Sequence, residues 1–454
     1  MDKMTDLLAS YTTSLKFDEL PANVVQQAKR MIVDALGCAI GGYHSEPARI
    51  ARELASTVTS TRPATILVSG HSTSPDMAAF ANGVMIRYLD FNDGYTGKEP
   101  CHPSDTLAAI LSPAEIVHAD GKTVLAATVL AYEVFCRLCD AASVRSRGFD
   151  HVTLGIIPSG LAAAKVMGLS QKQTAETVNL CIAPNQALFQ TRIGDVSMWK
   201  GCAFANASRN AVFASLLAER GLTGPSPVFE GVGGFFTAVS GEPFTLEPFG
   251  DTGGPFKIME ATIKRFPLGL YSQTVVQAAL EVRGSLSRVE DIAHVNVQTL
   301  QTAEDIMAGD DEKWHPANRE TADHSMPYTV AVALMYGSVE EHHFGEEYLR
   351  NPQLLDLGQK VKVSVSEEAN RRAPEAMLST VEVVTTSGDR HSSPEVPYHR
   401  GHWKNPMTNQ ELEEKFRALA RDILTPAQVD ALLDRLWNLE QVDDIGQVIG
   451  MVRV

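Results

Sequence analysis

A loop near residue 100 collects ionisable side chains between two segments rich in alanine and leucine. The loop, residues 89–105, contains Asp90, Asp93, Lys98, His102 and Asp105. A histidine with carboxylates nearby can move protons near neutral pH, because a carboxylate orients the imidazole ring and raises its basicity. The alternative is a structural loop in which Ser104 or Asp105 caps the helix that follows. Both interpretations fit the residue types.

Four later segments place polar residues at the expected start of a helix or in a turn. They are RGFDHVTLG with His151, VSMWKGCAF with Lys200, KRFPLG with Lys264, and TADHSMPY with His324 and Tyr328. A lysine at a helix N-terminus opposes the macrodipole, so Lys200 has no helical reason to stand there and can face an anion instead. His324 and Tyr328 share one face if the helix begins before them. The structural alternatives are a buried histidine, an exposed lysine or a helix cap.

Helices are the elements expected to position most of these residues. Apolar residues recur at helical spacing from the start of the chain to about residue 240. Residues 20–42 are typical, with a proline near the start and paired glycines at the end. The many small residues in these segments allow close helix contacts, which favours a compact bundle.

The pattern changes after about residue 270. Residues 295–303, 360–368 and 380–393 cluster β-branched side chains, and we expect antiparallel strands there, with a buried helix at SMPYTVAVALMYGSV between them. The predicted fold class is mainly α, with a large helical domain and an inserted smaller α+β lid domain. The expected boundaries are residues 1–268 for the first part of the helical domain, 269–403 for the lid, and 404–454 for C-terminal helices that return to the helical domain.

Composition narrows the classes of partner and compartment. The chain has 454 residues, a formal charge of −16 and six cysteines. The negative charge argues against nucleic acid and anionic membranes as partners, and no apolar run approaches the ~20 residues that span a bilayer. Sparse cysteines without a secretory signal predict a cytoplasmic protein. Cys136 and Cys139 are expected to be buried helix residues, because no second cysteine pair completes a metal site.

The order and spacing of these motifs resemble the MmgE/PrpD family, which contains 2-methylcitrate dehydratase, cis-aconitate decarboxylase and iminodisuccinate epimerase. The resemblance runs through LDFND and HPSD, GFDHVTLG, WKGCAFANASRNAVFASLLAERGLTGP, KRFP, ADHSMPY and GHWKNPMT. It implies a helical domain with an α+β lid, commonly a homodimer, and a pocket for a small anionic polycarboxylate. One departure follows the KRFP turn. Leu270, Tyr271, Ser272 and Gln273 stand where family members often carry a histidine or another polar residue, which leaves the fit of the substrate open.

Carried over by position, the resemblance implies His102, Asp93 and His151 as catalytic residues and Lys200, Lys264 and Tyr328 as substrate-binding residues. We expect His102 to be the principal acid or base, Asp93 to orient and tune it, and His151 to be the second proton-transfer group. The two lysines would bind carboxylates, and Tyr328 would donate a hydrogen bond to the substrate. Such groups can transfer the protons and stabilise the developing aci-carboxylate charge, so no cofactor and no metal are expected.

The favoured reaction is dehydration of 2-methylcitrate to 2-methylaconitate, a lyase reaction of propionate catabolism. Decarboxylation of cis-aconitate to itaconate needs the same cationic pocket, and epimerisation of iminodisuccinate needs two proton-transfer groups on opposite faces of one carbon. Both alternatives stay open, because spacing does not reveal whether His102 and His151 flank the substrate. A non-enzymatic helical scaffold is a further alternative, which thermal stabilisation by polycarboxylates would separate from an enzyme.

Overall fold

The structure is a computed structural model that describes residues 2–453. Contacts divide the chain into two units. Unit 1 comprises Met1–Thr191, Gly201–Ile263 and Thr408–Val454, and unit 2 comprises Arg192–Lys200 and Lys264–Met407. The predicted boundaries after residues 268 and 403 lie within a few residues of these. The short segment that ends at Lys200 was expected in the helical domain and belongs instead to unit 2.

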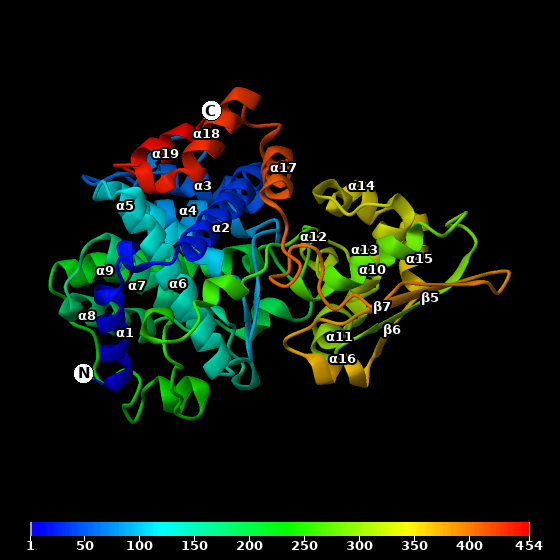
Figure 1. Ribbon diagram of the computed structural model, residues 1–454, viewed down its shortest axis with the longest axis horizontal. Coiled ribbons are helices and arrows are strands. Elements are labelled where there is room, and N and C mark those ends of the chain that lie inside the picture. The colour runs from blue at the N-terminus through cyan, green and yellow to red at the C-terminus, as the bar shows by residue number, and fades with distance from the viewer. Residues whose placement is uncertain (1, 454) are drawn as a thin grey trace. The chain divides into compact units, whose positions relative to one another are not determined.

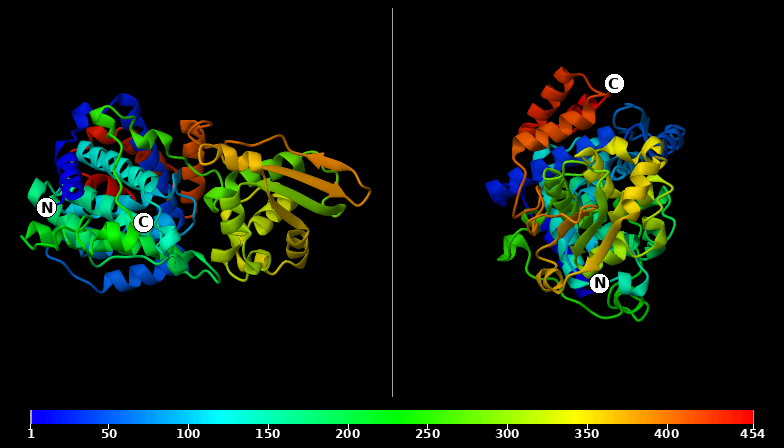
Figure 2. Two further views of the ribbon diagram at one scale, coloured as in Figure 1. Left: turned by 90° about the horizontal axis from the view of Figure 1, so that it is seen from below. Right: turned by 90° about the vertical axis from the view of Figure 1, so that its right-hand side faces the viewer.

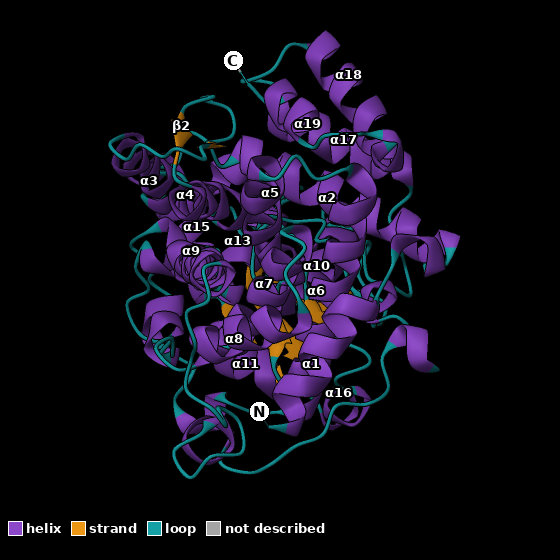
Figure 3. Ribbon diagram, turned by 90° about the vertical axis from the view of Figure 1, so that its left-hand side faces the viewer, coloured by secondary structure: helices purple, strands orange, loops and turns teal. Residues whose placement is uncertain are grey.

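Unit 1 consists almost entirely of helices, as Figure 3 shows in purple. They are α1 (Lys3–Ser14), α2 (Ala22–Gly41), α3 (Glu46–Ser56), α4 (Pro75–Arg87), α5 (Leu107–Ile116), α6 (Gly121–Ala141), α7 (Val152–Val166), α8 (Gln171–Ile182), α9 (Trp199–Glu219, which belongs to unit 1 from Gly201 on), α17 (Asn409–Ala420), α18 (Pro426–Trp437) and α19 (Gly446–Met451). Short strand pairs join β1 (Ala64–Thr65) to β2 (Ser72–Thr73) and β3 (Tyr95–Thr96) to β4 (Pro100–Cys101). The predicted mainly α fold class is confirmed.

Helix α2 lies in the core of unit 1, where α4, α6 and α17 pack against it. It follows Pro21 and ends before Gly42, as the sequence predicts. Helix α17 comes from beyond residue 407 and returns to α2, beside which it is drawn in Figure 1. The two helices share a buried ion pair, in which Lys415 Nζ lies 2.6 Å from Asp34 Oδ1.

The cysteine pair lies inside α6, and both side chains are buried, as expected. The structure adds Cys101 from β4, which hydrogen bonds both thiols. Burial raises the pKa of all three, that of Cys136 to about 11, so they are neutral thiols at neutral pH. Among the described residues, no helix is long and apolar enough to cross a membrane.

Unit 2 contains a four-stranded sheet in the order β6-β5-β7-β8. The strands are β5 (Ile292–Thr299), β6 (Val361–Val365), β7 (Thr380–Thr385) and β8 (Arg390–Ser392). The expectation of purely antiparallel pairing is wrong, because β5 and β6 are parallel, whereas β7 pairs antiparallel with β5 and β8. The chain between β5 and β6 forms several helices, and such a crossover returns the second strand in the direction of the first. Gly388, with φ +92°, lies in the predicted turn between β7 and β8.

Helices make up the rest of unit 2. They are α10 (Gln273–Arg283), α11 (Gln301–Met307), α12 (Arg319–Ala322), α13 (Met326–Tyr336), α14 (Glu346–Leu349), α15 (Pro352–Gln359) and α16 (Glu367–Arg372). Helix α10 packs on β7 and α13 on β6, and the two helices also contact each other. Figure 2 shows helices of unit 2 beneath the sheet in its left panel. The buried helix predicted between the strands is α13, whose residues from Met326 to Leu334 are all buried.

Candidate functional site

The carboxylate of Asp93 is buried in the loop that joins α4 to α5 in unit 1. It accepts hydrogen bonds from the hydroxyl of Ser104 at 2.6 Å, the backbone N–H of Ser104 at 3.1 Å and the hydroxyl of Tyr132 at 2.6 Å. Burial raises the pKa of Asp93 to about 6, although the hydrogen bonds from Ser104 and Tyr132 stabilise the charged form. Asp93 therefore titrates much closer to neutral pH than an ordinary aspartate.

His102 is oriented by the backbone of the same residue. Its Nδ1 lies 2.6 Å from the carbonyl oxygen of Asp93. A carbonyl oxygen only accepts hydrogen bonds, so Nδ1 carries a proton, and in the neutral ring Nε2 carries the lone pair. The expectation that the Asp93 carboxylate orients the ring is therefore wrong in its detail, because that carboxylate bonds Ser104 and Tyr132.

His151 brings a second imidazole to His102. The ring centroids are 5.8 Å apart and the rings are steeply inclined. His151 directly precedes α7, and its Nδ1 lies 3.2 Å from the carboxylate of Asp150. Unit 1 thus brings its three predicted catalytic residues together, with two imidazoles side by side and a carboxylate buried behind one of them.

The side chains of Asn92, Ser104 and Asp105 form hydrogen bonds within the loop of residues 89–105 and do not cap a helix. Residues Pro103–Thr106 form a 3₁₀ helix before α5, and neither Ser104 nor Asp105 makes a capping bond. The side-chain amide of Asn92 donates to Ser104 Oγ at 2.9 Å and to Asp105 Oδ1 at 2.8 Å. The capping expectation is wrong, because both side chains serve contacts across the loop that sequence spacing does not reveal.

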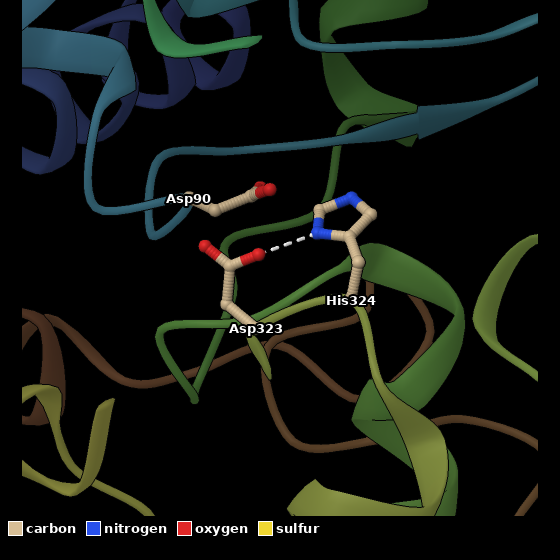
Figure 4. A group of neighbouring side chains, drawn as sticks. All are labelled: Asp90, Asp323 and His324. Atoms are coloured by element: carbon tan, nitrogen blue, oxygen red, sulfur yellow. Dashed lines mark hydrogen bonds and ion pairs between the residues drawn. The ribbon is translucent and has the colours of Figure 1, made fainter. Parts of the chain in front are cut away.

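In unit 2, Lys200 meets an acidic and an imidazole group. Its Nζ lies 2.5 Å from Asp323 Oδ1 and 2.9 Å from His324 Nδ1. The same two atoms of Asp323 and His324 are 2.6 Å apart, and the dashed line in Figure 4 marks this interaction. The anion that Lys200 was expected to face is therefore, in this structure, the carboxylate of Asp323.

Lys264 lies in the turn that follows unit 1 along the chain, and its side chain is fully buried. The backbone N–H of Gly269 in the same turn donates to the carbonyl of Asp323 at 2.9 Å. Burial, reinforced by the charge of Lys264, lowers the pKa of His399 to about 4. His399 is therefore neutral at physiological pH, and Lys264 supplies positive charge to its surroundings.

Tyr328 is buried in the first turn of α13. Its hydroxyl donates to the backbone carbonyl of His343 at 2.6 Å. Ser325 caps α13 by accepting from the N–H of Tyr328, so His324 precedes the helix and the predicted shared face is wrong. Donation from Tyr328 to a substrate stays a prediction, and it requires the bond to His343 to break.

Sequence reasoning missed two polar residues that the structure brings into these clusters, Tyr132 and Lys313. Tyr132 donates to Asp93 from α6, and Lys313 is a buried lysine of unit 2. A signal for the first was present, since Tyr132, Glu133 and Arg137 lie in the largely apolar middle of this helix. Glu133 and Arg137 form a buried ion pair at 2.7 Å. Nothing local marks Lys313, which follows three acidic residues and looks exposed in the sequence.

Known proteins named cis-aconitate decarboxylase and 2-methylcitrate dehydratase align with most of this chain. Cis-aconitate decarboxylase of Homo sapiens is 26% identical over 100% of this chain and 95% of its own length. Mitochondrial 2-methylcitrate dehydratase of Yarrowia lipolytica is 27% identical over 95% of this chain and 86% of its own. 2-Methylcitrate dehydratase of Escherichia coli is 29% identical over 81% of this chain and 80% of its own length.

The family profiles match both halves of the chain. The MmgE/PrpD N-terminal domain matches residues 6–247, and the MmgE/PrpD C-terminal domain matches residues 266–439. The junction between these two matches falls where unit 1 gives way to unit 2 along the chain. With both domains matched in order and relatives aligned along most of its length, this chain belongs to the MmgE/PrpD family.

Proposed function

We propose that this protein is a cofactor-independent lyase that dehydrates a small hydroxy-polycarboxylate, and that its substrate is 2-methylcitrate, converted to 2-methylaconitate. The observation that carries the proposal is the imidazole pair of His102 and His151, 5.8 Å apart, in which the tautomer of His102 is set by the Asp93 carbonyl. Relatives named 2-methylcitrate dehydratase, aligned over most of their length, support the choice of substrate.

In the proposed reaction, Nε2 of His102 takes the proton from the carbon next to a carboxylate. The electrons of that C–H bond form the carbon–carbon double bond, and the C–O bond to the neighbouring hydroxyl breaks. His151 gives its proton to the departing hydroxyl, which leaves as water. Throughout this cycle Nδ1 of His102 keeps its bond to the Asp93 carbonyl, so the ring changes charge without turning.

Positive charge from Lys200 and Lys264 is proposed to hold the substrate carboxylates and to stabilise the negative charge that develops as the proton leaves. Removing one such donor is expected to cost ~2.7–4 kcal/mol of activation free energy. The proposal needs no metal. Tyr328 stays a proposed donor to the substrate.

Cis-aconitate decarboxylase is the second candidate, because the human enzyme of that name aligns with the whole of this chain. The same lysines would bind cis-aconitate. Loss of carbon dioxide would then leave a carbanion, to which one of the two histidines would give a proton. This reaction forms itaconate and releases no water.

The test is incubation of chelator-treated protein, separately, with 2-methylcitrate, citrate, cis-aconitate and iminodisuccinate in deuterated water, followed by proton NMR. An alkene formed from 2-methylcitrate is the expected result. Itaconate from cis-aconitate, or deuterium exchange into iminodisuccinate, would replace dehydration by decarboxylation or epimerisation. Activity that chelators abolish and metal restores would contradict the cofactor-free mechanism. The proposed homodimer and cytoplasmic location stay predictions.

A further inference from the structure

Lys313 is a buried lysine whose ammonium has no hydrogen-bond acceptor among the residues that the structure describes. It ends the 3₁₀ helix Asp311–Lys313 before α12, and its side chain is 1% exposed. Its backbone is held, because the hydroxyl of Ser325 donates to its carbonyl oxygen. The backbone of Lys313 is therefore held in place, whereas its ammonium group lacks a hydrogen-bond acceptor among the described residues.

Other buried or half-buried lysines in the described part of the chain have partners. Lys29 contacts Glu440 and the carbonyl of Trp437, the half-buried Lys165 donates to the carbonyls of Thr12 and Leu15, and Lys415 pairs with Asp34. Desolvating an ammonium without a hydrogen bond costs several kcal/mol, and proteins ordinarily avoid it. The unsatisfied ammonium of Lys313 therefore points to a ligand rather than to a structural role.

The charges around Lys313 indicate the sign of that ligand. Burial lowers the pKa of Lys313, and the charge of Lys200 lowers it further, whereas Asp310, Asp323 and Glu312 act in the opposite direction. Asp323 already pairs with Lys200 at 2.5 Å. The charges of the two buried ammonium groups thus repel each other while Lys200 holds the Asp323 carboxylate. An anion placed between the two ammonium groups would relieve their repulsion and supply the missing acceptor.

We propose that Lys313 is a further substrate-binding residue, which holds one carboxylate group of a small polycarboxylic acid together with Lys200. The inference rests on the proposed function for the class of ligand, and on the unsatisfied ammonium and its proximity to the Lys200 ion pair for the position. With Lys313 in this role, the protein would prefer acids that can place a carboxylate group between Lys313 and Lys200. Its role is binding, since nothing places it at a proton-transfer step.

The experiment compares wild type with Lys313→Met and the control Lys165→Met, which removes a half-buried lysine whose ammonium already has two carbonyl acceptors. Thermal unfolding midpoints are measured without ligand, and affinities for 2-methylcitrate and citrate are measured by titration calorimetry. Lys313→Met is expected to unfold at the same temperature or higher, because it loses a desolvated charge. It should bind both acids about 10- to 100-fold more weakly. Lys165→Met should unfold at a lower temperature and bind both acids as wild type does.

Each contrary outcome identifies what is wrong. A Lys313→Met protein that unfolds at a lower temperature or fails to fold, or that binds the acids as tightly as wild type, would overturn the role of Lys313 alone. A wild-type protein that binds neither acid would overturn this inference and the proposed substrate class together. Turnover of 2-methylcitrate by wild type, with an unchanged KM in Lys313→Met, would leave the proposed function standing and remove this binding residue.

Discussion

Asp93 makes the stability of unit 1 depend on pH in an unusual direction. The ordinary pKa of an aspartate is 3.8, and burial raises that of folded Asp93 to about 6. Between these values the folded protein binds a proton that the unfolded chain has lost. Because stability falls with pH wherever the folded state binds more protons, the contribution of Asp93 is greatest below about pH 4 and is lost as the pH rises through about 6.

The size of this loss follows from the same pKa difference. A difference from 3.8 to about 6 corresponds to about 3 kcal/mol of unfolding free energy at neutral pH. Asp93→Asn resembles the protonated acid at every pH, since an amide can still accept from Ser104 and bond Tyr132. The variant should therefore gain about 3 kcal/mol relative to wild type between about pH 4 and pH 7.

Urea unfolding of both proteins across this pH range, followed by circular dichroism, measures the difference. Taking the difference between the two proteins removes the contributions of other titrating groups. Tyr132→Phe is a companion variant, because loss of its hydrogen bond to the carboxylate should move the transition to higher pH. A stability difference that stays constant with pH would show that Asp93 keeps an ordinary pKa and refute the reasoning from burial.

Three further substitutions test the site. His102→Gln is expected to lower kcat by about 10²- to 10⁴-fold on the true substrate, whereas His118→Ala, at an exposed surface ion pair, should leave it unchanged; near-normal turnover in His102→Gln would contradict the proton-transfer role. Lys200→Met should raise KM and lower the free energy of unfolding by ~3–5 kcal/mol, because it leaves the buried Asp323 carboxylate without its ammonium partner. The double variant with Asp323→Asn should regain the free energy of unfolding, measured in urea, but should keep the raised KM. Tyr328→Phe should cost about 1–3 kcal/mol, because a buried carbonyl loses its donor; thermal stability equal to wild type would contradict that bond.

Much of the helical fold could be predicted, because helix signals are local. The spacing of apolar residues in α2, with Pro21 before it and Gly42 after it, fixes that element almost to the residue. The direction of β6 could not be predicted, because it depends on the long connection from β5 and not on the five residues of the strand. The predicted strand over residues 295–303 extends too far, because β5 ends at Thr299 and Leu300 already precedes α11. The residue types after Thr299 do not reveal this change from strand to helix.

Candidate site residues could be named from the sequence, but the contacts between them could not. Residue types alone singled out the loop around His102, whereas the contact of that residue with His151 became visible only in the structure. The path of the backbone decides that the carbonyl oxygen of Asp93, and not its carboxylate, bonds the His102 ring. Asp90 in this loop adopts φ +50°, a conformation that composition does not predict. The partner hydroxyl of Tyr132 comes from a helix far along the chain, so only tertiary packing brings it near.

The return of α17 to α2 bears on how the protein folds as it is made. Residues 408–453 leave the ribosome after all of unit 2, so α2 is synthesised long before the helix that covers it. Until then Asp34 lacks the ammonium of Lys415, and apolar residues of α2 lack part of their cover. A nascent chain in this state exposes surface that chaperones recognise and that promotes aggregation. Early folding of unit 2 would compact the long segment between the two halves of unit 1 and lower the entropic cost of joining them.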